Sequence, residues 1–171
     1  MTLENIYYIG QTIAVVAILG SLAGIYFQQR QANKIARSDM SQRVSSSFSD
    51  SMRELMSNPG LALAFRKVMF ERSELDPVES TQILTYFNLT LTAHADAYLA
   101  YNEGLIGRPL LTTFDGNTAW YLTAPAFERE WRRVRRFALY PPNFCDHVDA
   151  QFAKLFPDNA AAPQAVEAPS S

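Results

Sequence analysis

The feature that most constrains this chain is an uncharged, mostly apolar run of 22 residues, Ile6 to Phe27. Its only strongly polar members are Gln11, Thr12 and Ser21. As an α-helix rising about 1.5 Å per residue, the run would reach about 33 Å, against a bilayer hydrocarbon core of about 30 Å. Nothing else in the sequence approaches it. The sequence therefore predicts one transmembrane helix, residues 6–27, behind a short head, residues 1–5.

Basic residues lie on one side of this run only. Glu4 is the single charged residue before it, whereas Arg30, Lys34 and Arg37 follow closely. Because Lys and Arg resist translocation, this asymmetry predicts a head that faces outward and a C-terminal part in the cytoplasm.

A cleaved signal peptide is the competing interpretation, because residues 21–23, before Gly24, imitate a small-residue cleavage site. Against it, the head carries no Lys or Arg and the apolar core is too long. Aromatic rings prefer the headgroup region, and four lie near the ends of the run: Tyr7, Tyr8, Tyr26 and Phe27. They favour a retained anchor.

Residues 28–156 amount to one domain. They hold all 15 basic residues and 14 of the 17 acidic ones, so their formal charge is +1, against -2 for the whole chain. This near-neutral balance makes nucleic acid a poor partner. One cysteine, Cys145, excludes an internal disulfide and a zinc site of the usual cysteine type. The Ala-, Pro- and Ser-rich tail, residues 157–171, is predicted to be disordered.

The predicted fold class is all-α, with the transmembrane helix continuing into a cytoplasmic bundle of about five helices. No Gly or Pro interrupts the chain from Gln28 to Asn58, so the first helix is predicted to continue to that point. A second helix, capped by Asn58, is predicted to begin at Pro59 and to end near Arg72. The first helix has an apolar face at steps of three to five: Ile35, Met40, Val44, Phe48, Met52 and Leu55.

Capping signals delimit the later helices. Asp76-Pro77-Val78-Glu79 predicts the start of a central helix and Gly104 its end. Turn residues at 107, 109, 115–117 and 125 predict a short helix or an ordered loop after it. The next helix would place Phe127, Trp131, Val134 and Ala138 on one face and end at Pro141-Pro142, and the last would carry Phe144, Val148, Phe152 and Leu155.

The chain resembles an uncharacterised group of short bacterial single-span membrane proteins with a helical cytoplasmic domain. The matching features are the span running into residues 28–33, the segment 98–105, and Phe127 with Trp131 before Phe144 and Val148-Asp149. The resemblance implies a fold and a place in the bacterial inner membrane, and no activity. Residues 108–125 depart from it, being richer in turn residues than the helix expected there.

The Arg face, defined as Arg129, Arg132, Arg133 and Arg136, lies opposite the apolar face of the helix that begins near Phe127. Three interpretations stay open. The face is solvated and paired with neighbouring acids, it meets anionic lipid headgroups, or, least favoured, it meets nucleic acid.

Small residues form a strip along one side of the span: Gly10, Ala14, Ala17, Gly20, Ser21 and Gly24. Gly20 and Gly24 make a GxxxG pair. Such strips let two membrane helices approach closely, so a homodimer or pairing with another membrane protein is predicted beside the ordinary interpretation that small residues are common in any span.

No catalytic motif or cofactor is predicted. His94 and His147 sit in no metal-binding pattern, since His147 and Cys145 would point to different sides of a helix. The sequence favours a membrane-tethered interaction or scaffold module. The alternative is a membrane-bound sensor or enzyme with a pocket lined by His94, Asp96, Tyr98 and Trp131. An effector of stress or phage defence is a third hypothesis.

Overall fold

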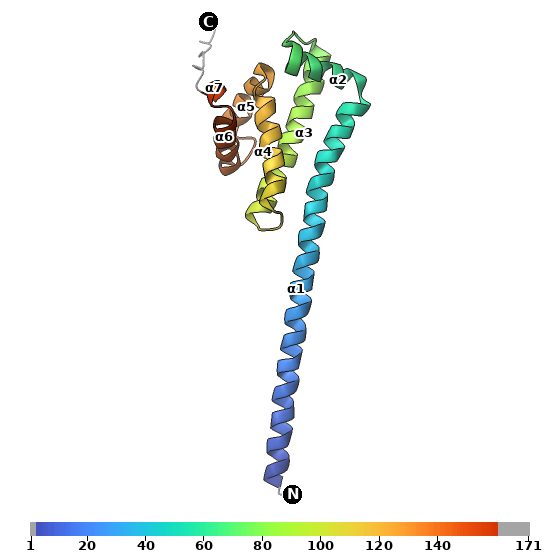
Figure 1. Cartoon of the computed structure of the whole chain (residues 1–171), viewed down its shortest axis with the longest axis vertical. Coiled ribbons are helices and arrows are strands. Elements are labelled where there is room, and N and C mark those ends of the chain that lie inside the picture. Colours follow the sequence, from blue (N-terminus) through green and yellow to red (C-terminus); the bar gives the residue numbers. More distant parts are fainter. Residues whose placement is uncertain (1–2, 161–171) are drawn as a thin grey trace. The chain divides into compact units, whose positions relative to one another are not determined.

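The computed structural model describes residues 3–160, and within that range every regular element is a helix (Figure 1). The chain divides into two compact units, residues 1–39 and 40–171, and the boundary falls within the first helix. The all-helical fold class and the long apolar N-terminal helix are as the sequence predicts.

Helix α1 spans Leu3–Ser57 without a break, as the absence of Gly and Pro after Gln28 predicts. In the part of the chain that is described, it is the one helix long and apolar enough to cross a membrane, a test that signal sequences also pass. The predicted cap after it is confirmed, because the Asn58 side chain accepts a hydrogen bond from Leu61 N at 3.1 Å. Helix α2, Pro59–Arg66, follows, and the π-helical turn η1, Lys67–Glu71, ends at Arg72 with φ 53°.

Helix α3, Pro77–Asn102, begins with the capping box that the sequence predicts. The Asp76 carboxylate accepts from Val78 N and Glu79 N at 2.8 Å, and Glu79 accepts in return from Asp76 N at 3.1 Å. Gly104 follows the helix with φ 70°, the left-handed conformation in which glycine costs least. Both predicted ends of this helix are confirmed.

Residues 108–122 form a helix of 15 residues, α4, Arg108–Leu122, so of the two predicted alternatives the helix is correct and the ordered loop is wrong. Asp115-Gly116-Asn117 lies inside it rather than in a turn. Glycine costs about 1 kcal/mol relative to alanine within a helix, and packing of an apolar face offsets costs of this size. Here Leu111, Phe114 and Leu122 are each 3% exposed, so tertiary packing has overridden local propensity.

Helix α5, Pro125–Arg136, ends five residues before the predicted stop at Pro141. Ala138 has φ 50° and is exposed, so it does not belong to the apolar face assigned to it. Its N–H donates to Arg135 O and that of Leu139 to Val134 O, the bonding of a Schellman motif. This backbone closure ends the helix without a glycine or a proline.

Helix α6, Pro142–Leu155, is followed by a short helix, α7, Pro157–Ala160, at the start of the predicted tail. Residues 161–171 lie outside the described residues. Of the predicted α6 face, Phe144 and Val148 are buried and Phe152 is partly buried, but Leu155 is 46% exposed. The apolar face of α6 therefore ends one turn earlier than its spacing predicts.

Within residues 40–160, two apolar clusters hold the helices together. The larger one joins α2, η1, α3, α4, α5 and α6, and its fully buried rings include Phe87, Tyr121, Phe127 and Phe144. The smaller one joins Val44 of α1 to α3 and α4, where Phe48 meets Phe114 edge-on with ring centroids 5.4 Å apart. Ile35 is 53% exposed, so it is not part of this packed face. Of the six buried polar residues described, four lie on α3 and α4: Thr90, His94, Asp115 and Thr118.

Candidate functional site

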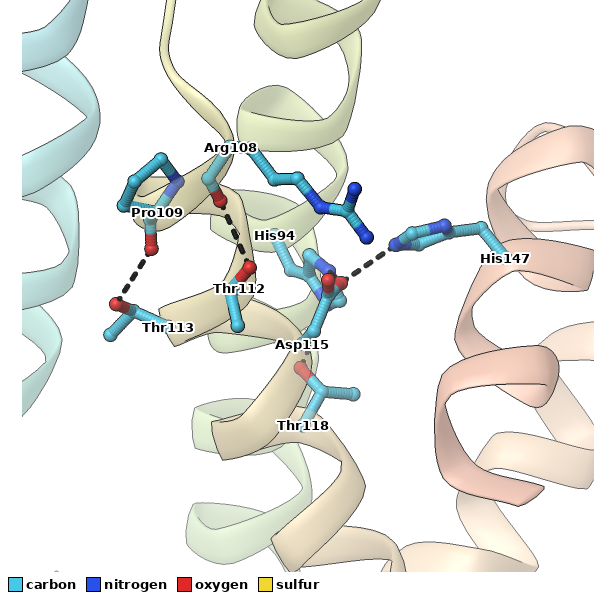
Figure 2. Close-up of polar contacts among 8 residues, drawn as sticks. All are labelled: His94, Arg108, Pro109, Thr112, Thr113, Asp115, Thr118 and His147. Carbon is cyan, nitrogen blue, oxygen red and sulfur yellow. Dashed lines mark hydrogen bonds and ion pairs between the residues drawn. The ribbon is translucent and has the colours of Figure 1, made fainter. Parts of the chain in front are cut away.

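His94 of α3, Asp115 of α4 and His147 of α6 form the His–Asp–His cluster (Figure 2). His94 Nε2 lies 2.9 Å from Asp115 Oδ1, and His147 Nε2 lies 2.7 Å from the same oxygen. His94 is 1% exposed, Asp115 is buried, and His147 is partly exposed. One carboxylate oxygen thus joins two imidazoles in the interior of the domain.

Aromatic rings position the two histidines. The His94 ring stacks on Phe114 with centroids 6.0 Å apart and meets Phe144 edge-on at 5.1 Å. The His147 ring lies 4.7 Å from that of Tyr98. Because these rings belong to α3, α4 and α6, the same packing that assembles the three helices also aims both imidazoles at Asp115.

Thr118 completes the hydrogen bonding around His94. A carboxylate only accepts, so the Nε2–H of each histidine donates to Asp115. His94 Nδ1 is then an acceptor, and it lies 2.9 Å from the Thr118 hydroxyl, which donates to it. The buried imidazole has both ring nitrogens satisfied.

Burial and hydrogen bonding set the charges in the His–Asp–His cluster. Burial lowers the pKa of His94 below its ordinary value, outweighing the attraction of Asp115. Burial by itself would raise the pKa of Asp115, but hydrogen bonds from His94 and His147 more than offset it and leave that pKa below its usual value. An ionised carboxylate therefore lies against a neutral His94.

The three side chains offer one ligand atom each, and these atoms all lie within 4.8 Å of one another. Two imidazole nitrogens and one carboxylate oxygen are the donors found in three-ligand zinc sites and in non-haem iron sites. The sequence interpretation considered His94 and His147 separately and joined neither to Asp115. The structure brings all three residues together.

Spacing alone hides this cluster, because 21 residues separate His94 from Asp115 and 32 separate Asp115 from His147. One signal was available in the sequence. Residues 111, 114, 115, 118 and 122 stand at i, i+3, i+4, i+7 and i+11, which predicts a helix with Asp115 and Thr118 on its inward face. Gly116 and Asn117 led the interpretation towards a turn instead.

The Arg face lies on the solvent side of α5, and all four residues are exposed. Arg132 pairs with Glu128, and Arg133 Nε lies 3.4 Å from the buried Glu130. The Arg136 guanidinium lies 5.0 Å from the centre of the Phe137 ring. Two of the four charges are thus matched within α5, as the solvated interpretation expects, and the lipid interpretation stays a prediction.

The small-residue strip lies on α1, where every residue from Gly10 to Gly24 is exposed. A methyl group built on Gly10, Gly20 or Gly24 would meet no atom of the described structure within 4 Å. The Ser21 hydroxyl donates to Ala17 O at 2.9 Å, and that of Thr12 donates to Tyr8 O at 2.9 Å. The strip is therefore open along its length, and these two hydroxyls bond to their own helix.

The alternative pocket would need His94, Asp96, Tyr98 and Trp131 to line one cavity. Tyr98 and Trp131 both pack on Phe144, near His94, and Trp131 Nε1 donates to Asp149 at 2.7 Å. Asp96 instead lines a groove of about 300 Å³ between α3 and Met40 to Ser47 of α1. A cleft of about 670 Å³ contains none of the four and is bordered by Arg72, Glu74, Arg129, Glu130 and Arg133 among others.

No protein-family model matches the chain, and no curated protein or solved structure matches it at a significant level. The resemblance to short bacterial membrane proteins therefore stays a prediction, and function has to be argued from the geometry.

Proposed function

We propose that the protein is a single-span membrane protein whose helical domain acts as an interaction or scaffold module on the cytoplasmic side of a bacterial inner membrane. The observation that carries the proposal is the exposure of apolar side chains in the span. Ile13, Val16, Ile18, Leu19 and Leu22 are 56–63% exposed, on several sides of one helix. An apolar surface this continuous needs an apolar surrounding, and a bilayer supplies one.

The bonding of polar groups in the span supports the same proposal. Unpaired hydroxyls are costly in hydrocarbon, and those of Thr12 and Ser21 already donate to backbone oxygens one turn earlier. The first charges after the span, Arg30, Lys34 and Arg37, then favour a cytoplasmic domain by the positive-inside rule.

An interaction role is supported by the hydrogen bonding of the buried polar groups in the domain. Of the side chains that the structure describes, no buried nitrogen or oxygen lacks a hydrogen-bond partner. Cys145 is buried, and burial raises the pKa of its thiol, which disfavours the reactive thiolate. Two exposed surfaces that a partner could contact are the small-residue strip and the Arg face.

Cross-linking in membranes tests the small-residue strip. Replacing Gly20 and Gly24 by Ile adds bulk where a Cβ would meet nothing within 4 Å beyond the adjoining residues and backbone of the helix, so we expect the single chain to keep its fold. Close approach of two spans would be blocked, and the dimer yield should fall severalfold. Leu22→Phe, which adds bulk on the opposite side of the helix, is the control. An unchanged dimer yield in the glycine variant would remove self-association through this strip.

Liposome flotation tests the Arg face. Replacing Arg132, Arg133 and Arg136 by Gln should weaken binding of the 40–171 unit to vesicles that contain anionic lipid, since each basic residue near the surface contributes about 1 kcal/mol. Vesicles of neutral lipid are the control. Equal binding by wild type and variant would leave the solvated interpretation of this face.

A further inference from the structure

We infer that His94, Asp115 and His147 bind one divalent transition-metal ion, of which Zn²⁺ is the first to test. The proposal goes beyond membrane anchoring and does not depend on it. Among the described residues, no second set of three His, Cys, Asp or Glu ligand atoms converges as these do. Imidazole nitrogens suit Zn²⁺ and its neighbours in the transition series, and a carboxylate completes a common three-ligand set.

The geometry is close to that of a bound ion. With zinc–ligand bonds of about 2.0–2.2 Å, tetrahedral ligand atoms lie about 3.4 Å apart. The two N···O separations are 2.9 and 2.7 Å, and both nitrogens already point at the same oxygen. An ion can enter if each nitrogen moves about half an ångström or more from the Asp115 oxygen and the two nitrogens, which lie within 4.8 Å of each other, settle about 3.4 Å apart.

Thr118 supplies the outer support that metal-binding histidines usually have. When His94 Nε2 binds an ion, its proton moves to Nδ1, and the Thr118 hydroxyl changes from donor to acceptor. A hydroxyl can do either, so the 2.9 Å contact between Nδ1 and Thr118 Oγ1 serves both forms of the ring.

The open coordination position lies on the His147 side of the His–Asp–His cluster. His94 is sealed inside, whereas His147 has 18% of its side chain exposed, so a water ligand and the ion itself would enter there. In Figure 2 the Arg108 side chain extends from the start of α4 towards this side. Its positive charge opposes a cation, so removing it should strengthen binding.

Metal analysis of the full-length chain tests the proposal. The protein is purified in mild detergent through a tag without histidine, stripped with chelator, and titrated with Zn²⁺ by calorimetry and with Co²⁺ by visible absorption. We expect one ion per chain and the d–d bands of a low-coordinate Co²⁺ site. Asp115→Asn and His147→Gln should each weaken binding at least tenfold, and Thr118→Val about tenfold. Arg108→Gln should bind roughly two- to fivefold more tightly.

Asp146→Asn is the matched control, because Asp146 precedes His147 on α6 but its side chain is 70% exposed and pairs with Arg135 instead. It should bind as the wild type does. Circular dichroism identifies variants that fail to fold, and His147→Gln, at the partly exposed ligand, keeps the test usable if Asp115→Asn unfolds. Absence of a stoichiometric ion in the wild type, or wild-type affinity in folded His147→Gln, would overturn the proposal and leave the three residues as a hydrogen-bonded core cluster.

Discussion

Residues 10–27 of α1 and the whole of α3 are both long helical segments rich in apolar side chains, yet they lie in opposite surroundings. Along 10–27 every residue is exposed, whereas in α3 Ile83, Phe87 and Leu91 are 0% exposed. The hydrogen-bond partners of their polar side chains differ as well. Ser21 bonds to its own helix, but His94 bonds to α4. A helix whose polar side chains bond to its own backbone suits a uniform apolar solvent. A helix whose polar side chains bond to neighbouring helices suits a protein core.

Arginine pairs at equally exposed positions should have very different effects in the two regions. In the span, Ile18→Arg with Leu22→Arg should release the protein from membranes, because each arginine near the centre of a membrane helix costs about 3 kcal/mol. In α3, Leu89→Arg with Leu99→Arg should leave membrane association unchanged. The four side chains are 52–59% exposed, so exposure alone does not separate them. Alkaline extraction measures the difference, and equal retention of both variants would contradict the proposed span.

Ring deletion in the core should be the largest stability effect within the domain. Phe87 is 0% exposed and stacks on Phe127 with centroids 4.7 Å apart. Phe87→Ala should lower the free energy of unfolding by about 3–5 kcal/mol, since it removes buried area and leaves a cavity. Phe137→Ala is the control, because Phe137 is 58% exposed and exposed substitutions usually change stability by about 0.5 kcal/mol or less. Urea unfolding followed by tryptophan fluorescence compares them, and similar midpoints would mean that the stack contributes little.

Helix ends with a local chemical signal could be predicted from the sequence. Asn58, Asp76 with Glu79, and Gly104 each act through atoms within a few residues, so their roles can be read without the fold. The end of α5 could not, because Ala138 adopts φ 50° without being glycine. For residues 108–122 the sequence left a short helix or an ordered loop open, because Gly116 and Asn117 are local turn signals that long-range packing overrides.

The candidate site was the least predictable part. Three side chains from three helices meet at Asp115, and neither histidine carries a local pattern that points to it. They converge because Phe114 and Phe144 pack against His94 and Tyr98 packs against His147. A polar residue on the inward face of a helix needs a partner, so a correct helix for residues 108–122 would have raised the question of what Asp115 meets.

Thr118 and Thr112 let the buried and exposed sides of α4 be compared with the same substitution. In metal-free protein, Thr118→Val should cost about 1–3 kcal/mol, because it leaves the buried His94 Nδ1 without its donor. Thr112→Val should be close to neutral, since the Thr112 hydroxyl is exposed and bonds to Arg108 O of its own helix. Valine keeps the branched shape in both cases. Thermal unfolding in the presence of chelator measures the two, and equal shifts would mean that the Thr118 hydrogen bond does not stabilise the fold.

The smallest expected difference between the two regions is in how the stability of the fold falls at alkaline pH. Tyr86 and Tyr121 are 3% and 1% exposed with hydroxyl oxygens 3.2 Å apart, and burial raises the pKa of both above the ordinary value of 10.0. In the unfolded chain these phenols lose their protons near pH 10, but in the folded domain they keep them. Their contribution is therefore fully present below about pH 10 and is lost as the pH rises further.

At pH 11 the loss should be about 1.4 kcal/mol for each tyrosine that stays protonated only in the folded state. Tyr86→Phe should flatten the fall in stability between pH 9 and 11, whatever its effect at neutral pH, while Tyr26→Phe, at a 62% exposed position in the span, should not. Absorbance at 295 nm with parallel circular dichroism follows ionisation and unfolding together. If every phenol ionised near pH 10 with the helices intact, the Tyr86–Tyr121 pair would be open to water. The domain core would then not exclude water at the Tyr86–Tyr121 pair, and it would not differ there from the exposed span.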